Sequence, residues 1–116
     1  MTYKTFDIVV VPFPFTDRLE HKNRPAIILS SEKFFNTFSE HTVLAMITSG
    51  ENEPWPLDIV IEQLETCGLS KSSVIRMKLF TIDNRLIKQK IGALHKTDQA
   101  SLIESWNYLF HDVVKK

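Results

Sequence analysis

The chain has 116 residues, 43% of them hydrophobic and 24% charged, and its formal net charge is zero. We assign residues 1–116 to one soluble globular domain. The longest aliphatic run, Ile8–Val11, is too short to cross a bilayer, and the first residues lack the apolar segment of a signal peptide. The single cysteine, Cys67, excludes an internal disulfide and favours the reducing cytoplasm. The cysteine and the four histidines show no metal-ligand spacing, so we expect no metal. We also expect no cofactor and no membrane partner.

The first quarter of the chain predicts two strands joined by a loop. Phe6–Pro12 is rich in β-branched residues and predicts the first strand, which Pro12 and Pro14 end. Residues 13–23 are mostly polar or charged in their second half and predict an exposed, mobile loop. Pro25–Leu29 predicts the second strand, and we place Pro25 at its first position because proline cannot donate to a sheet. Pro25 also biases Arg24 toward an extended conformation.

Short strands continue along most of the remaining chain. Ser30–Asn36 predicts a helix cap followed by a short helical turn. Apolar runs and alternating patterns then predict strands over His41–Thr48, Leu57–Glu62, Ser72–Ile82 and Ile87–Leu94.

The C-terminal segment has a helical pattern instead. Thr97 is the expected N-cap, and apolar residues then recur at helical spacing, namely Leu102, Ile103, Trp106, Leu109, Phe110 and Val113. We expect Trp106 and Phe110 to lie in the core and seat this helix on the strands. The whole pattern predicts a mainly β fold with short helices, a small β-barrel closed by a C-terminal amphipathic helix.

Charge is unevenly distributed despite the net charge of zero. Lys71–Lys96 holds seven basic residues and one acidic residue, whereas Gly50–Glu65 holds five acidic residues and no Lys or Arg. Arg76 and Lys78 are two positions apart, which predicts that they share one face of a strand. These charges indicate either a local basic surface for phosphates or acidic and basic strands that pair with each other.

Arg24 is the first candidate site residue. It stands where an apolar strand begins, so its backbone is expected to be rigid while its guanidinium points outward. A guanidinium offers five donors in a fixed fork that suits a phosphate. The alternative is that Arg24 caps the strand end and pairs with a carboxylate.

Several segments carry a family resemblance in the same order along nearly the whole chain. They are Asp7–Val9, Pro12–Asp17, Arg24–Ser30, Ile47–Ser49, Gly68-Leu69, Ser72–Val74, Leu79–Asp83 and Ile91-Gly92. This set resembles the MazF/PemK family of toxin endoribonucleases, the toxin half of bacterial toxin–antitoxin pairs.

The resemblance implies a compact SH3-like barrel that forms a homodimer. Such a protein would cleave single-stranded RNA, often mRNA, at short sequences without a metal ion. Its partner antitoxin would place a disordered acidic tail in the RNA groove, and contact with DNA would occur only through that antitoxin. The family's catalytic residues fall on Arg24 and Thr48, and the loop from Phe13 to Asn23 matches the segment that borders the groove.

The resemblance also leaves one role open. Many family members carry an acidic residue at the position of Met77, and some use it as the general base, which this chain cannot do. Arginine stays protonated under ordinary conditions, whereas a histidine near pKa 6.5 suits proton transfer. We therefore predict that Arg24 and Thr48 stabilise the transition state and that His21 assists proton transfer.

RNA contacts are predicted around these groups. Arg76 and Lys78 would bind phosphates, and Phe15 would either stack on a base or pack its loop onto the barrel. The full predicted set of RNA-binding residues is Phe15, Thr16, Lys22, Ser49, Arg76 and Lys78.

Two other functions compete with RNA cleavage. One is the poisoning of DNA gyrase by toxins that share this barrel. A resemblance to those toxins would imply a tryptophan near the C-terminus, whereas the tryptophans of this chain are internal. An inert SH3-like module would bind peptides through an aromatic groove, to which Phe13, Phe15 and Trp55 are the available contributors.

Overall fold

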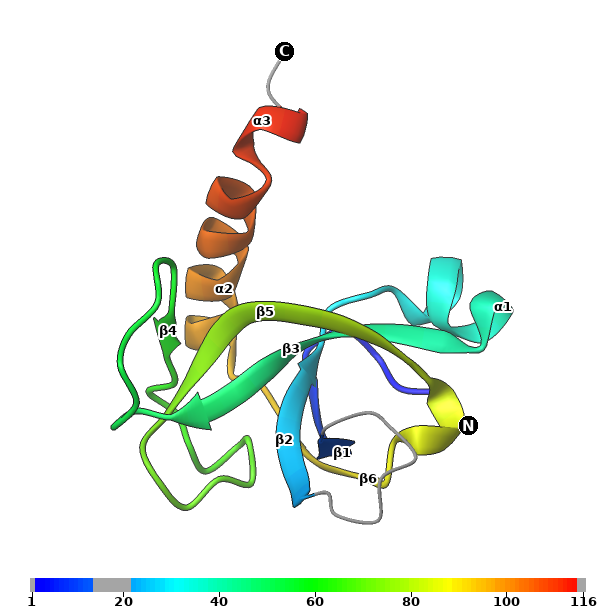
Figure 1. Cartoon of the computed structure of the whole chain (residues 1–116), viewed down its shortest axis with the longest axis horizontal. Helices are drawn as coiled ribbons and strands as arrows, with labels where there is room; N and C mark the ends of the chain where they lie inside the picture. The colour runs from blue at the N-terminus through cyan, green and yellow to red at the C-terminus, as the bar shows by residue number, and fades with distance from the viewer. Residues whose placement is uncertain (1, 14–21, 115–116) are drawn as a thin grey trace.

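The computed structural model describes residues 2–13 and 22–114 (Figure 1). Its strands form one antiparallel, six-stranded sheet in the order β4-β5-β3-β2-β1-β6, which curls into a half-barrel. The strands are β1 (Asp7–Phe13), β2 (Lys22–Ile28), β3 (His41–Ser49), β4 (Ile59–Val60), β5 (Ser73–Asp83) and β6 (Gln89–Ala93). The prediction of a mainly β fold with short helices is confirmed, and the predicted barrel is an open one.

The apolar runs are continuous because the central strands are buried on both faces. Successive side chains of a strand point to opposite faces, so Ile8 and Ile27 join one core cluster, whereas Val9 and Ala26 join a second. Leu102 of the C-terminal helix completes the first cluster. A sheet covered on both faces shows no alternation of apolar and polar residues, which explains the run Ile8–Val11.

Two prolines lie inside strands, which corrects the predicted boundaries. Pro25 is the fourth residue of β2 and pairs with Val10, while Pro12 lies within β1 and pairs with Asn23. Both prolines are tolerated because each strand has only one neighbour at that point: β3 pairs with β2 from Ala26 onward, and β6 pairs with β1 only up to Val10. Phe13, Lys22 and Asn23 of the predicted loop 13–23 are thus parts of strands, and the remainder, 14–21, lies outside the described residues.

A register shift in the β3–β5 pairing separates Arg76 from Lys78. Ala45 pairs with Leu79, whereas the next residue, Met46, pairs with Arg76, so β5 bulges between these two points. A bulge interrupts the alternation of side chains. Arg76 is consequently buried while Lys78 is exposed, so the two do not form the basic surface that we predicted for phosphate binding.

The short helices connect strands and carry exposed aromatic residues. The π-helix η1 (Glu32–Asn36) begins at the N-cap Ser31, as the predicted cap and helical turn require, and leads into α1 (Thr37–Ser39). The buried Asn36 donates from Nδ2 to the carbonyl of Tyr3, and Asn84 donates to the carbonyl of Asn36, which fixes this lobe on the sheet. Asn84 begins the 3-10 helix η2 (Asn84–Leu86).

The C-terminal helix packs on the sheet only through its first turns. α2 spans Lys96–Leu109, and α3 (His111–Val114) follows it. The N-cap is His95, whose side chain accepts a hydrogen bond from the N–H of Thr97, so the prediction of Thr97 as the N-cap is wrong. Leu102 is buried, whereas Trp106 and Phe110 are half-buried, so the prediction that these two aromatic residues lie in the core is wrong. Figure 1 shows the reason: the second half of α2 extends away from the sheet, to which only the first turns of the helix lie close.

Candidate RNA-cleaving site

A pocket of about 240 Å³ brings the main predicted residues together. Arg24 reaches it from β2, Thr48 and Ser49 reach it from the end of β3, and the segment before β5 closes the other side. Its lining comprises Arg24, Pro25, Ile47, Thr48, Ser49, Leu69, Ser70, Lys71, Ser72 and Ser73. Residues from two strands and from the segment before a third thus share one cavity.

The Thr48 hydroxyl is held by the turn that follows its strand. Its Oγ1 accepts a hydrogen bond of 2.6 Å from the side-chain amide of Asn52. Gly50 donates from its backbone N–H to the carbonyl of Ser72 at 3.1 Å, and a Cβ at this glycine would lie 2.8 Å from the Ser72 Oγ. A side chain at position 50 would therefore require the exposed Ser72 hydroxyl to rotate away from the turn.

The charged groups of Arg24 and Lys78 both lie against the aromatic ring of Phe13. The Arg24 guanidinium carbon lies 5.8 Å from the centre of the Phe13 ring, and the Lys78 Nζ lies 5.5 Å from it. Both side chains are exposed, and neither forms an ion pair with another described residue. Two exposed cations held beside one ring attract an anion such as a phosphate.

Arg76 has a different environment. Its side chain is 10% exposed and forms an ion pair with Asp58 at 2.9 Å. The guanidinium also donates to the carbonyl of Glu53 at 2.8 Å and lies 5.0 Å from the centre of the Trp55 ring. The acidic and basic segments of the sequence therefore pair at this point, and Arg76 is not exposed for phosphate binding.

The Asp58 carboxylate is held in its charged form by this arrangement. Burial on its own would raise the pKa of Asp58, but the hydrogen bond from Arg76, the hydrogen bond from the backbone N–H of Trp55 and the charge of Arg76 together lower it. The N–H of Trp55 donates to Oδ2 of Asp58 at 2.9 Å. Asp58 and Arg76 thus join the segment around Trp55 to β5.

The remaining predicted residues are divided between described and undescribed parts of the chain. Lys22 is exposed and pairs with Phe13 at the start of β2. Ser49 lines the pocket, and its Oγ accepts a hydrogen bond from the Glu51 N–H at 3.2 Å. The predicted residues Phe15, Thr16 and His21 lie outside the described residues.

The sequence reasoning missed two polar groups at the pocket. Lys71 lines it and adds a third cation, although its only signal in the sequence was its place at the start of the basic segment. Asn52 donates a hydrogen bond to Thr48, and a turn sequence after a strand gives no sign of such a contact.

Met77, at which the resemblance implied an acid in many relatives, is half-buried and packs against the core. No group of three or more potential metal-ligating side chains occurs within residues 2–13 and 22–114.

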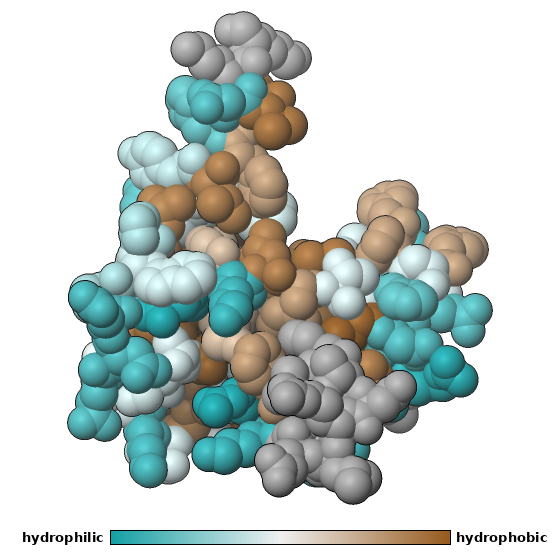
Figure 2. All heavy atoms as spheres, in the orientation of Figure 1, coloured by the Kyte–Doolittle hydropathy of each residue, from teal (hydrophilic) through white to brown (hydrophobic). Residues whose placement is uncertain are grey.

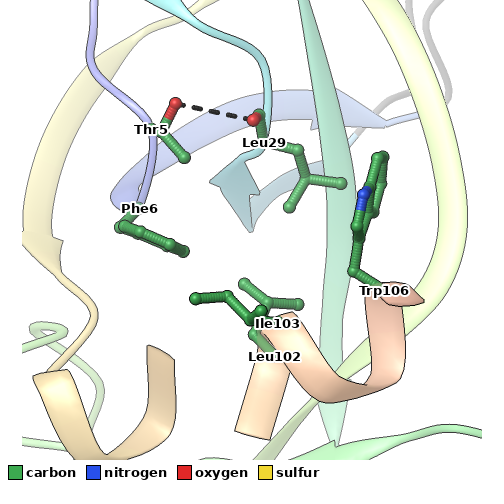
Figure 3. A pocket seen from close by; sticks show the side chains of 6 residues that line it. All are labelled: Thr5, Phe6, Leu29, Leu102, Ile103 and Trp106. Carbon is green, nitrogen blue, oxygen red and sulfur yellow. Dashed lines mark hydrogen bonds between the residues drawn. The ribbon is translucent and has the colours of Figure 1, made fainter. Parts of the chain in front are cut away.

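A second concave surface is apolar, in contrast to the basic pocket of Arg24 and Thr48. Figure 3 shows a pocket of about 150 Å³ in which Phe6 and Leu29 face Leu102, Ile103 and Trp106 of α2. A neighbouring pocket of about 260 Å³ is lined by Leu29, Ser30, Phe35, Val43 and Trp106. We call the surface formed by Leu29, Phe35, Val43, Ile103 and Trp106 the apolar saddle, and Figure 2 shows hydrophobic residues gathered along α2 and across the sheet beside it.

Solved structures of similar shape define the fold of this protein. The Mycobacterium tuberculosis toxin MazF-mt6 is 21% identical, with a TM-score of 0.72 over 90% of this chain and 96% of that chain. A chain of a MazE-MazF crystal structure from Deinococcus radiodurans is 16% identical, with a TM-score of 0.75 over 96% of this chain and 98% of that chain. A mycobacterial endoribonuclease in complex with its cognate antitoxin is 9% identical, with a TM-score of 0.73 over 94% and 93%. The half-barrel is therefore a MazF-like fold.

The family itself follows from the sequence. Residues 4–107 match the family described as PemK-like, MazF-like toxin of type II toxin-antitoxin system, and the chain belongs to this family. A search of curated proteins found no sequence match. Among the described residues, no helix has the length and apolar character needed to cross a membrane.

Proposed function

We propose that this protein is a metal-independent, sequence-specific endoribonuclease that inhibits growth as the toxin of a toxin–antitoxin pair. The observation that carries the proposal is the shared pocket of Arg24 and Thr48, with Lys71 on its rim and Lys78 beside Arg24. Exposed cations around a hydroxyl donor suit a phosphodiester. Membership of the PemK-like, MazF-like family supports the same activity.

The proposed reaction is attack of an RNA 2′-hydroxyl on the adjacent phosphorus. The O2′–P bond forms and the P–O5′ bond breaks, which leaves a 2′,3′-cyclic phosphate and a 5′-hydroxyl. Arg24 and Thr48 donate hydrogen bonds to the phosphate oxygens as negative charge builds on them. A base accepts the proton from O2′ and an acid gives a proton to O5′, and we propose that His21 assists these transfers.

Substitution of His21 by alanine would then lower the cleavage rate and alter its pH profile, whereas an unchanged rate and pH profile would exclude this role.

The proposed RNA contacts surround the pocket. Lys22 and Lys78 bind neighbouring phosphates, Ser49 adds a hydroxyl donor, and Phe15 and Thr16 contact the bases or sugars. Arg76, which we placed in this set from sequence, instead supports the segment around Trp55 through its bonds to Asp58 and Glu53. We place the protein in the cytoplasm, where its RNA substrate occurs.

Two protein partners complete the proposal. A cognate antitoxin would cover the basic pocket with an acidic tail, and DNA would be contacted only through that antitoxin. A second copy of this chain would cover the apolar saddle. Support for the antitoxin comes from solved relatives, two of which are described as complexes with an antitoxin or with MazE. Support for the homodimer comes from Ile103 and Val113 of the C-terminal helices, which are 50% and 79% exposed.

The first experiment is cleavage of a long single-stranded RNA in the presence of EDTA, with the wild type and Arg24→Ala compared. We expect discrete fragments that end in 2′,3′-cyclic phosphate from the wild type. Arg24→Ala should lower the rate by at least 100-fold, because it removes charged donors from the transition state. Arg24 is exposed, so thermal unfolding should be unchanged. No cleavage by a folded wild type, or full cleavage by Arg24→Ala, would contradict the proposal.

A further inference from the structure

Asn52 bonds to the pocket hydroxyl from outside the pocket. Its Nδ2 donates to Oγ1 of Thr48 at 2.6 Å, while the residues that line the pocket do not include Asn52. The side chain therefore approaches Thr48 from the side of the turn. No other side-chain hydrogen bond of Thr48 joins described residues.

This contact determines what the Thr48 hydroxyl offers to a ligand. A hydroxyl has one proton to donate and two lone pairs with which to accept. An amide N–H occupies a lone pair, so the proton of Thr48 is directed away from Asn52. Because Thr48 lines the pocket beside Arg24, that proton is available to an acceptor inside the pocket. Asn52 thus fixes the hydroxyl as a donor.

The turn holds Asn52 in place through its backbone. The N–H of Asn52 donates to the carbonyl of Ser49 at 3.2 Å, and Gly50 donates to Ser72 at 3.1 Å. Both bonds involve main-chain atoms, so a change of the Asn52 side chain leaves the turn intact. The side chain is exposed, and its removal opens no cavity in the core.

We infer that Asn52 is a positioning residue for RNA cleavage, which orients the Thr48 hydroxyl to donate to the phosphate. The inference rests on the proposed function of the Arg24–Thr48 pocket. Asn52 acts through Thr48 and touches no reacting atom. Its loss should therefore lower kcat and leave KM nearly unchanged, because the hydrogen bond it supports strengthens as charge develops.

The test compares Asn52→Ala and Asn52→Asp with the wild type on one RNA substrate over a range of pH. Asn52→Ala should lower kcat about tenfold, since one hydrogen bond loses its orientation. Asn52→Asp should lower it further at neutral pH, because a carboxylate accepts the Thr48 proton and draws it out of the pocket. Its activity relative to the wild type should recover as the pH falls toward about 4, where the acid form can donate again.

Matched variants separate this role from a general loss of structure. Gln63→Ala, an exposed amide outside the pocket, should behave as the wild type. In a Thr48→Val background, Asn52→Ala should have no further effect, since the hydroxyl that it orients is gone. Wild-type activity of Asn52→Ala, an equal and pH-independent loss in both variants, or additive losses with Thr48→Val would overturn the inference and leave the proposed function standing. A wild type that cleaves no RNA would overturn both.

Discussion

The Arg76 side chain holds the segment from Glu53 to Asp58 against β5. Its guanidinium contacts an aromatic ring, a main-chain carbonyl and a carboxylate, which come from Trp55, Glu53 and Asp58. The segment follows directly on the turn that carries Asn52. The ion pair therefore supports one side of the pocket from a distance.

Stability should depend on this ion pair in a pH-dependent way. Asp58→Asn should lower the free energy of unfolding by about 2 kcal/mol at pH 7, because it leaves the buried guanidinium with a neutral partner. The pKa of Asp58 is lower in the folded protein than its ordinary value of 3.8, so its stabilising effect is present above that value and is lost as the pH falls below it. Urea denaturation of both proteins between pH 7 and pH 3 should show the difference shrinking with acid.

The exposed pair of Asp83 and Arg85 provides the control. Their side chains interact at 2.8 Å, but that of Arg85 is exposed to solvent. Exposed pairs contribute little to stability, so Asp83→Asn should have a smaller effect at pH 7 than Asp58→Asn. Equal effects of the two substitutions, or a constant effect of Asp58→Asn at all pH values, would argue against a special role of the buried pair.

At the level of single residues, sequence reasoning finds chemical types more readily than their environments. Arg24 was identified as an outward-pointing cation, and it is exposed beside the pocket. Arg76 was assigned the same role, but its partner Asp58 is 18 positions away and the β5 bulge turns it inward. The convergence of Arg24 and Thr48 came from the family resemblance, since spacing alone does not place two strand ends together. Asn52 depends on a turn geometry that composition does not encode.

The start of α2 is fixed by one buried carboxylate. Asp98 is 1% exposed and accepts hydrogen bonds from the backbone N–H groups of Glu62 and Gln63 at 3.0 to 3.2 Å. These residues follow β4, so the carboxylate joins the first turn of α2 to the end of that strand. With Leu102 in the core, it accounts for the attachment of the helix to the sheet.

Loss of this carboxylate should loosen the helix. Asp98→Ala leaves two N–H groups without their acceptor, and we expect a loss of about 3 kcal/mol in the free energy of unfolding. Asp98→Asn keeps one carbonyl acceptor and should cost about half as much. Hydrogen exchange should show reduced protection in α2 for Asp98→Ala. The fully exposed Asp112 of α3 is the matched site, and Asp112→Ala should match the wild type in both measurements.

At the level of elements, periodicity predicts where strands and helices occur better than it predicts which elements pack beside them. β-branched runs identified β1, β2, β3 and β5, because their residues suit a pleated, buried surface. The prolines were misplaced because a strand with one neighbour tolerates what a central strand does not. In α2, helical spacing marks an apolar stripe, but it does not tell whether the chain itself covers that stripe.

The molecule as a whole leaves a continuous apolar surface beside α2. The apolar saddle joins the exposed residues of the helix to Phe35 of η1, and it is concave at both pockets (Figure 2). Exposed hydrophobic surfaces of this kind mark interaction sites in soluble proteins. In the proposed homodimer, a second copy would bury the saddle on both partners at once, which is the geometry of a twofold dimer.

Placement of a charge in the saddle should separate the copies. Ile103→Asp puts a carboxylate into the apolar contact, and we expect the dimer dissociation constant to rise at least tenfold. Light scattering coupled to size-exclusion chromatography, over a dilution series, measures the change. Ser101→Asp adds the same charge at an exposed position of the same helix and serves as the control. A wild type that remains monomeric at high concentration, or an Ile103→Asp variant that remains dimeric, would contradict the proposed homodimer.

The two edges of the sheet have a consequence for aggregation. β4 has only two residues, and β6 exposes Gln89 and Lys90 beside the exposed Lys88. A very short edge strand offers little backbone to pair with, and lysines on an edge repel the same edge of another copy. Growth from molecule to molecule through β4 or β6 into a cross-β fibre is therefore disfavoured, and thioflavin binding by the concentrated protein tests this expectation.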